Sequence, residues 1–111
     1  MSQGSRERPL IFGYYSARSG IPVERLMTER QRLEAFAHRE GYAVANIFAE
    51  PSTEPSVALQ ALLESAARVP VAAVVVPEVS DLGTDEPTQL ATRERLERAG
   101  IRLLVLVRGA A

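Results

Sequence analysis

The stretch VAAVVV at residues 71–76 decides the fold, because it is an unbroken run of small and β-branched apolar side chains. Such residues favour strands, and a strand that is apolar on both sides is typical of the centre of a parallel sheet covered on both faces. Shorter apolar runs predict further strands at 10–15, 42–48 and 101–107. The run at 71–76 is therefore expected to lie inside a sheet of four strands.

The segments between these runs have the apolar spacing of helices, with apolar residues every three or four positions. Helices are predicted at 23–40, 57–69 and 88–100, with Ser56 as the N-cap of the second and Gly41 as the end of the first. The apolar stripe of the first helix is expected to consist of Leu26, Arg30, Leu33, Phe36 and Ala37.

Alternating strands and helices predict an α/β domain, a three-layer doubly wound sheet of four parallel strands in the order 2-1-3-4. The 111 residues fit one domain, divided as a disordered leader at 1–8, the domain at 9–108 and a tail at 109–111. In this strand order the carboxyl ends of the first and third strands flank a crevice, which is where such sheets bind ligands.

Composition argues against several kinds of function. The net charge of −1 gives no overall basic field for nucleic acid, and no apolar run is long enough to cross a bilayer. The chain has no cysteine, which fits a cytoplasmic protein, and all its basic residues are arginine, which suggests a bacterial source with GC-rich coding. The one histidine, His38, is predicted to be exposed near a helix end, which argues against a serine–histidine triad. No metal or other cofactor is expected.

The loop after the first strand carries the hydroxyls and the cation that the crevice could use. Its residues are YYSARSG at 14–20, with Ser16, Arg18 and Ser19 as the polar candidates. It lacks the glycine pattern of a dinucleotide or P-loop cradle. Arg18 could bind a phosphate, pair with Asp81 or Glu78 across the crevice, or be exposed.

Several longer segments resemble the catalytic domain of the resolvase/invertase group, the serine recombinases. They include GYYSARS at 13–19, LMTERQRLEAFAHREGY at 26–42 and AAVVVPEVSDLG at 72–83. The resemblance extends from about Leu10 to Val107 and implies that family's α/β fold. Its most specific positions are Leu26, Glu29, Arg30, Leu33, Glu34, Ala35, Phe36, Ala37, Gly41 and Tyr42.

The resemblance also implies where the chemistry of this family would lie. Its first strand usually ends in tyrosine, any residue, arginine, any residue and serine, and that serine forms a covalent phosphoserine link with DNA. Aligned on Tyr14, the arginine position holds Ser16 and the serine position holds Arg18. A slip of one residue would make Ser19 the nucleophile.

Two further arginine positions of the family also differ here. The arginine-proline pair before the second helix is replaced by Ser56 and Val57, and the aspartate-arginine-leucine run after the third strand is replaced by Ser80, Asp81 and Leu82. Since several phosphate-binding charges are replaced together, Ser16, Arg18, Ser19, Ser56, Ser80 and Asp81 are expected to be vestigial site positions.

The resulting hypothesis is a catalytically inactive recombinase-like domain that acts as a protein-binding or regulatory module. A protein partner or a second copy of the chain is expected, and no autonomous DNA-binding element is recognised. The alternative is an active or accessory recombinase subunit that exchanges DNA strands through a phosphoserine together with a full-length partner. A small-anion or nucleotide sensor is a third possibility.

Overall fold

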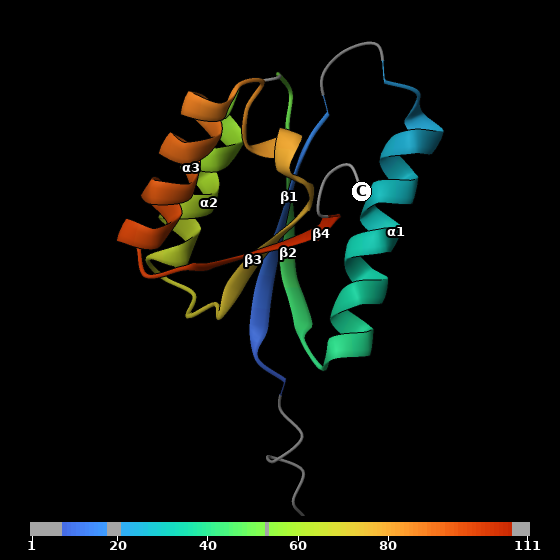
Figure 1. Ribbon diagram of the computed structural model, residues 1–111. Coiled ribbons are helices and arrows are strands. Elements are labelled where there is room, and N and C mark those ends of the chain that lie inside the picture. Colours follow the sequence, from blue (N-terminus) through green and yellow to red (C-terminus); the bar gives the residue numbers. More distant parts are fainter. Residues whose placement is uncertain (1–7, 18–20, 53, 108–111) are drawn as a thin grey trace, which may run out of the picture.

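Four parallel strands form one sheet in the computed structural model, which describes residues 8–17, 21–52 and 54–107 (Figure 1). The strands are β1 (Leu10–Ser16), β2 (Ala43–Glu50), β3 (Ala73–Glu78) and β4 (Arg102–Val107). Their order is β2-β1-β3-β4, and every neighbouring pair is parallel. The predicted fold class and strand order are confirmed.

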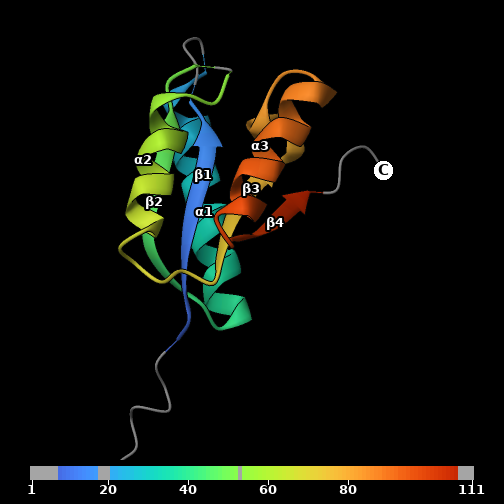
Figure 2. The same ribbon diagram turned by 90° about the vertical axis from the view of Figure 1, so that its left-hand side faces the viewer.

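The helices cover the two faces of the sheet unequally. They are α1 (Val23–Glu40), α2 (Val57–Ala66) and α3 (Glu86–Arg98), with a short 3-10 helix, η2 (Val79–Leu82), after β3. Figures 1 and 2 show α2 and α3 together on one face and α1 alone on the other. None of the helices in the described part of the chain is long and apolar enough to cross a membrane.

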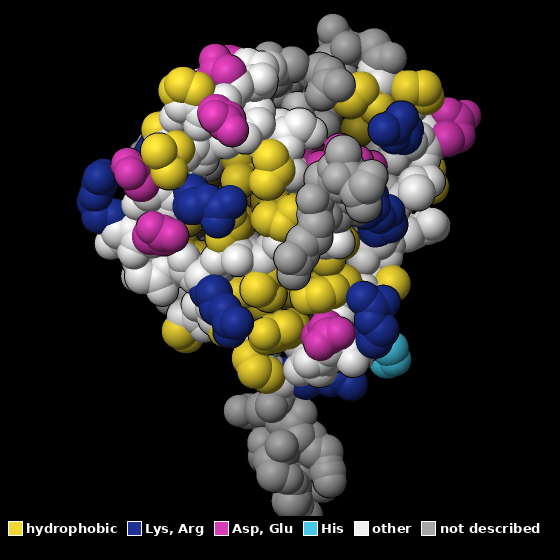
Figure 3. Space-filling model, in the orientation of Figure 1, with side chains coloured by type: hydrophobic (Ala, Val, Ile, Leu, Met, Phe, Trp, Pro, Cys, Tyr) yellow, Lys and Arg dark blue, Asp and Glu magenta, His cyan; other side chains and the backbone are white. Residues whose placement is uncertain are grey.

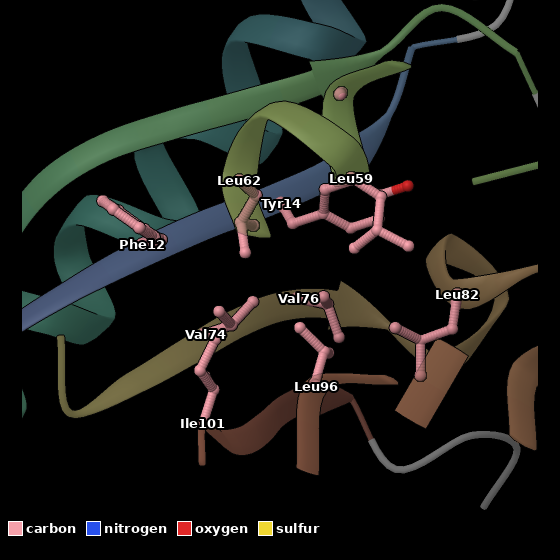
Figure 4. Packing of buried hydrophobic residues seen from close by; sticks show 10 residues of the cluster. Phe12, Tyr14, Leu59, Leu62, Val74, Val76, Leu82, Leu96 and Ile101 are labelled. Atoms are coloured by element: carbon pink, nitrogen blue, oxygen red, sulfur yellow. The ribbon is translucent and has the colours of Figure 1, made fainter. Parts of the chain in front are cut away.

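Alternating side chains of the central strands form two separate cores. On the α2 and α3 face, a buried cluster joins β1 and β3 to both helices (Figure 4); it contains Phe12, Tyr14, Ala58, Leu59, Leu62, Val74, Val76, Leu82, Leu96 and Ile101. On the α1 face, the buried cluster consists of Ile11, Tyr15, Leu33, Ala37, Ala73 and Val75. The two-residue period of the strands thus buries β1 and β3 on both faces.

Gly13 lets α1 lie close to the middle of β1. A Cβ at this position would lie 2.9 Å from Cδ1 of Leu33 and 3.1 Å from Cγ1 of Ile47. Any side chain here would push against the buried face of α1.

Gly41 ends α1, as predicted, in the left-handed conformation with φ of 84°. The following residue, Tyr42, donates its backbone N–H to the carbonyl of Ala37 at 2.8 Å. This pattern of a helix end needs a residue that tolerates positive φ, which glycine does without strain.

Several sequence predictions differ from the structure in detail. The second helix ends at Ala66 instead of 69, and the third is Glu86–Arg98 instead of 88–100. β3 spans Ala73–Glu78 instead of 71–76 and so includes Pro77; the proline is tolerated because β1 pairs with β3 only as far as Val75. β2 continues to Glu50 instead of ending at 48. Arg30 was wrongly assigned to the apolar stripe of α1, since it is exposed while Glu29 is half-buried.

Candidate functional site

The carboxyl ends of β1 and β3 meet at a crevice, as the strand order predicts. Ser16 is the last residue of β1, and Asp81 lies in η2, directly after β3. The backbone N–H of Ser16 donates to Oδ1 of Asp81 at 2.8 Å. The segments after the first and third strands are therefore joined by a direct hydrogen bond.

Asp81 connects the two strand ends through both oxygens of its carboxylate. Oδ2 accepts a hydrogen bond from the backbone N–H of Glu78 at 3.0 Å, and the Glu78 side chain accepts one from the backbone N–H of Asp81. The net pKa shift of Asp81 is upward, and burial is its largest cause, while the two backbone hydrogen bonds lower the pKa. The carboxylates of Glu29 and Glu78 raise the pKa further. Asp81 thus acts as a clamp that joins the ends of β1 and β3, and the carboxylates of Glu29 and Glu78 beside it carry the same charge.

The hydroxyl of Ser16 is engaged with the backbone. Ser16 is 7% exposed, and its Oγ donates to the carbonyl oxygen of Ser52 at 3.1 Å. A serine nucleophile needs a group that takes up its proton, and a peptide carbonyl is not such a base. In this arrangement Ser16 links β1 to the segment after β2.

A cavity of about 230 Å³ opens beside these groups between β1, η2 and the start of α1. Among the described residues, its lining carries three carboxylates, those of Glu29, Glu78 and Asp81, and a single guanidinium, that of Arg25. Arg25 Nε lies 3.8 Å from Oε2 of Glu29, whose Oε1 is 2.9 Å from Nη1 of Arg32. The described lining of the cavity is Ser16, Ile21, Pro22, Arg25, Leu26, Glu29, Glu78, Ser80 and Asp81.

A second carboxylate, that of Glu50 at the end of β2, is buried at the start of α2. Glu50 is 1% exposed. It accepts the hydroxyl of Tyr14 at 2.7 Å and the backbone N–H groups of Ser56, Ala58 and Leu59, each at 3.0 Å. The free N–H groups at the start of a helix attract anions, and here the anion belongs to the chain itself.

These hydrogen bonds set the protonation of the Glu50 network. Burial alone would raise the pKa of Glu50, but the donors from Ser56, Ala58, Tyr14 and Leu59 outweigh it, and the net shift is downward. Burial, followed by the hydrogen bond to Glu50, raises the pKa of the Tyr14 hydroxyl. Glu50 therefore stays ionised while Tyr14 keeps its proton.

The structure brings three of the predicted site residues together. Ser16, Ser80 and Asp81 line the crevice, and the Ser80 hydroxyl donates to Oε1 of Glu78 at 3.4 Å. Ser56 lies elsewhere: it occupies the predicted N-cap position of α2, but its hydroxyl donates to Oε2 of Glu50 at 3.2 Å and does not cap the helix.

Two predicted site residues, Arg18 and Ser19, lie outside the described residues. The possible ion pair of Arg18 with Asp81 or Glu78 stays a prediction for the same reason. Within the described ranges, no group of three or more His, Cys, Asp or Glu residues is arranged to hold a metal ion. His38 is exposed in the last turn of α1, at the opposite end of that helix from the crevice.

The sequence interpretation missed Glu50 and Glu29. Glu50 lies between the predicted strand at 42–48 and the predicted helix at 57–69. An acidic residue that follows an apolar run and shortly precedes a helix start is well placed to bind that start. Glu29 was noted only as part of the family pattern. Glu29 contacts the cavity because α1 turns this residue toward the sheet, whereas the predicted apolar stripe contained its neighbour Arg30.

No protein-family model matches the sequence, and no curated protein matches it. The structure, in contrast, is similar to solved catalytic domains of serine recombinases. The C-terminal catalytic domain of ISC1926 TnpA, an IS607-like serine recombinase, aligns with 92% of this chain and 70% of its own, with a TM-score of 0.78 and 16% identity.

Two further structures give similar values. The N-terminal catalytic domain of TP901-1 integrase covers 87% of this chain and 77% of its own, with a TM-score of 0.74 and 15% identity. A resolvase family site-specific recombinase from Streptococcus pneumoniae covers 93% and 75%, with a TM-score of 0.74 and 18% identity. The chain therefore has the fold of serine recombinase catalytic domains, a resolvase-like arrangement of four parallel strands and their helices.

Proposed function

We propose that this protein is a catalytically inactive, serine-recombinase-like domain that acts as a protein-binding or regulatory module. The observation that carries the proposal is the charge of the crevice. Its described lining presents the carboxylates of Glu29, Glu78 and Asp81 against the single guanidinium of Arg25, which faces Glu29.

This charge balance is unfavourable for chemistry on a phosphodiester. Phosphoryl transfer is catalysed mainly by positive groups placed around the reacting phosphate, and the loss of one preorganised donor typically costs about 10²–10³ in rate. Here Asp81 has its Oδ1 2.8 Å from the backbone nitrogen of Ser16, so a phosphate near that serine would meet a carboxylate. At 4 Å, two like charges repel by about 4 kcal/mol at an effective dielectric of about 20.

The remainder of the domain is well formed. The described residues contain no buried side-chain N or O atom without a hydrogen-bond partner, and both cores are closed around the central strands. A well-packed scaffold beside a crevice of unsuitable charge fits a protein whose function depends on its surface, because function belongs to sites and not to folds.

The test is a search for covalent protein–DNA adducts. The purified protein is incubated with supercoiled DNA that carries candidate recombination sites, alone and together with a full-length recombinase from the same cell, and the products are separated under denaturing conditions. We expect no adduct of this chain under either condition, while the full-length recombinase serves as the positive control.

Three variants make the result specific. Ser16→Ala and Ser19→Ala remove the two hydroxyls that could attack, and Ser80→Ala removes an exposed hydroxyl of the same crevice as a matched control. Adducts that disappear in Ser16→Ala or Ser19→Ala but persist in Ser80→Ala would overturn the proposal. Adducts that this protein forms alone would show that it is an active recombinase subunit. Adducts that it forms only together with the full-length recombinase would show that it is an accessory subunit.

A further inference from the structure

The outer edge of β4 is a feature that the proposed function does not explain. β4 is the last strand of the sheet and pairs with β3 alone, so its other edge has no strand partner among the residues that the structure describes (Figure 2). Its sequence is RLLVLV, with one charge at Arg102 followed by five apolar residues. Edge strands usually carry charges, prolines or bulges that prevent further pairing, and β4 after Arg102 has neither a charge nor a proline.

A groove runs beside this edge on the face of the sheet that α1 covers alone. It has a volume of about 390 Å³ and is lined by Arg32, Ala35, Phe36, Arg39, Val105 and Leu106. Leu104 and Leu106 pack against the α1 core but remain only half-buried. Figure 3 shows hydrophobic side chains gathered on this side of the molecule, with dark blue arginines among them.

The charges of the groove are positive. Two guanidiniums, those of Arg32 and Arg39, line it, and its described lining contains no carboxylate. Arg32 is paired with Glu29, with Nη1 and Oε1 2.9 Å apart. Arg39 lies over the ring of Phe36, 5.7 Å from its centroid, and its ion pair with Glu40 at 3.6 Å is exposed on both sides. Such exposed pairs contribute little, so Arg39 can exchange its partner readily.

We infer that the edge of β4 and this groove bind an extended, acidic segment of a partner protein as an added strand. The inference rests on the proposed function as a protein-binding module and names the chemistry of its partner. The backbone of the segment would hydrogen-bond to the free edge of β4, as in other cases of strand addition. Alternate side chains would then point toward α1, where apolar groups meet Phe36 and Leu106 and carboxylates meet Arg32 and Arg39.

Charge distinguishes this occupant from a second copy of the chain. Pairing of two β4 strands would bring Arg102 and apolar side chains to the edge, and β4 has no carboxylate to offer to Arg32 or Arg39. An acidic segment satisfies the backbone edge and offers carboxylates to Arg39, whose present pair is exposed, and to Arg32, which already binds Glu29.

The probe is a short synthetic peptide that alternates glutamate and valine, compared with one that alternates lysine and valine. Binding is followed by amide chemical shifts of the isotopically labelled protein. We expect the glutamate peptide to shift the amides of Arg102–Val107 and of the Arg32–Arg39 segment of α1, and the lysine peptide to leave them unchanged.

A charge swap tests the role of the arginines. In the double variant Arg32→Glu and Arg39→Glu, we expect affinity for the glutamate peptide to fall about tenfold or more and the preference to turn toward the lysine peptide. Arg30→Glu, an exposed position on the same helix outside the groove, is the matched control and should leave affinity unchanged.

Several results would overturn the inference. These are shifts that map to the crevice around Asp81, equal binding of both peptides, or no binding of either one. Concentration-dependent dimerisation in sedimentation that alters the β4 amides would identify a second copy as the occupant. Binding that requires deletion of residues 108–111 would identify the end of the chain as the occupant. All of these outcomes leave the adduct experiment unaffected, so the two proposals can fail separately.

Discussion

Glu50 and Asp81 are two carboxylates at the carboxyl ends of the strands, Glu50 at the end of β2 and Asp81 directly after β3. They accept different sets of hydrogen bonds. Glu50 accepts hydrogen bonds from the Tyr14 hydroxyl and from the start of α2, and it is almost completely buried. Asp81 accepts two backbone N–H groups and lines a cavity together with Glu29. The pKa of Glu50 is lowered and that of Asp81 is raised.

The two carboxylates differ in the number of hydrogen bonds that they accept and in the charges around them. Burial is the largest influence on both groups and acts in the same direction. At Glu50 the dense set of donors exceeds it, whereas at Asp81 two donors do not, and the neighbouring carboxylates act against them. Glu50 is therefore a strong structural anchor and Asp81 a weaker clamp.

The largest expected effect comes from removal of the anchor. Glu50→Ala leaves the Tyr14 hydroxyl and the first N–H groups of α2 without their acceptor, and we expect the free energy of unfolding to fall by about 3–4 kcal/mol. Urea unfolding of the variant measures this. Glu94→Ala, an exposed position on α3, is the control and should change stability by less than about 0.5 kcal/mol. A loss no greater than that of the control would show that Glu50 is not an anchor.

Removal of the clamp should cost less. Asp81→Ala frees the N–H groups of Ser16 and Glu78, which lie near the cavity and can reach water, and we expect a loss of about 2 kcal/mol. The same urea experiment applies, with Ser80→Ala in the same 3-10 helix as the control. If Asp81→Ala proved as damaging as Glu50→Ala, the ranking of the two carboxylates would be wrong.

The dependence of stability on pH should have opposite signs for the two groups. Because the folded pKa of Glu50 lies below its unfolded value, its contribution is complete above the unfolded pKa and is lost as pH falls through the folded pKa. The folded pKa of Asp81 lies above its unfolded value, so its contribution decreases as pH rises from the unfolded to the folded pKa. Both effects should be smaller than the deletions, since protonation leaves the side chain in place.

Paired unfolding curves across the acid range measure these slopes. The stability advantage of the wild type over Glu50→Gln should shrink as pH falls, and its difference from Asp81→Asn should move in the other direction. Slopes of the same sign for both pairs would contradict the assignment.

The smallest effect is expected at the predicted helix cap. An N-cap serine typically contributes about 1 kcal/mol, but the Ser56 hydroxyl caps nothing and makes one hydrogen bond to Glu50 at 3.2 Å. We expect Ser56→Ala to cost about 0.5 kcal/mol, since Glu50 already satisfies the start of α2. A loss near 2 kcal/mol in thermal unfolding would assign the cap to Ser56 after all.

The architecture was predictable because its signals are local. The apolar runs place four strands, and the alternation with helices leads to the order β2-β1-β3-β4. Gly41 could be identified as a helix end because only a residue that tolerates positive φ fits there. These features depend on residues close in sequence or on the general handedness of crossovers.

The site was only partly predictable because its contacts join distant residues. Tyr14 and Glu50 are 36 positions apart, and Ser16 and Asp81 are 65 apart. The topology brings the strand ends together, which is why Ser16, Ser80 and Asp81 could be grouped in advance. The contacts of Glu50 depend on the register between β1 and β2, and the contact of Glu29 with the cavity depends on how α1 is rotated about its axis. Neither can be read from the apolar pattern alone.

Gly13 has a consequence for how this domain can diverge. The position without a side chain sets how closely α1 approaches the sheet, and the start of that helix forms one wall of the crevice. A methyl group at this point would press on the side chains of Leu33 from α1 and Ile47 from β2, which would have to move. Divergence at this position therefore requires compensating changes at Leu33 and Ile47, which belong to two different elements.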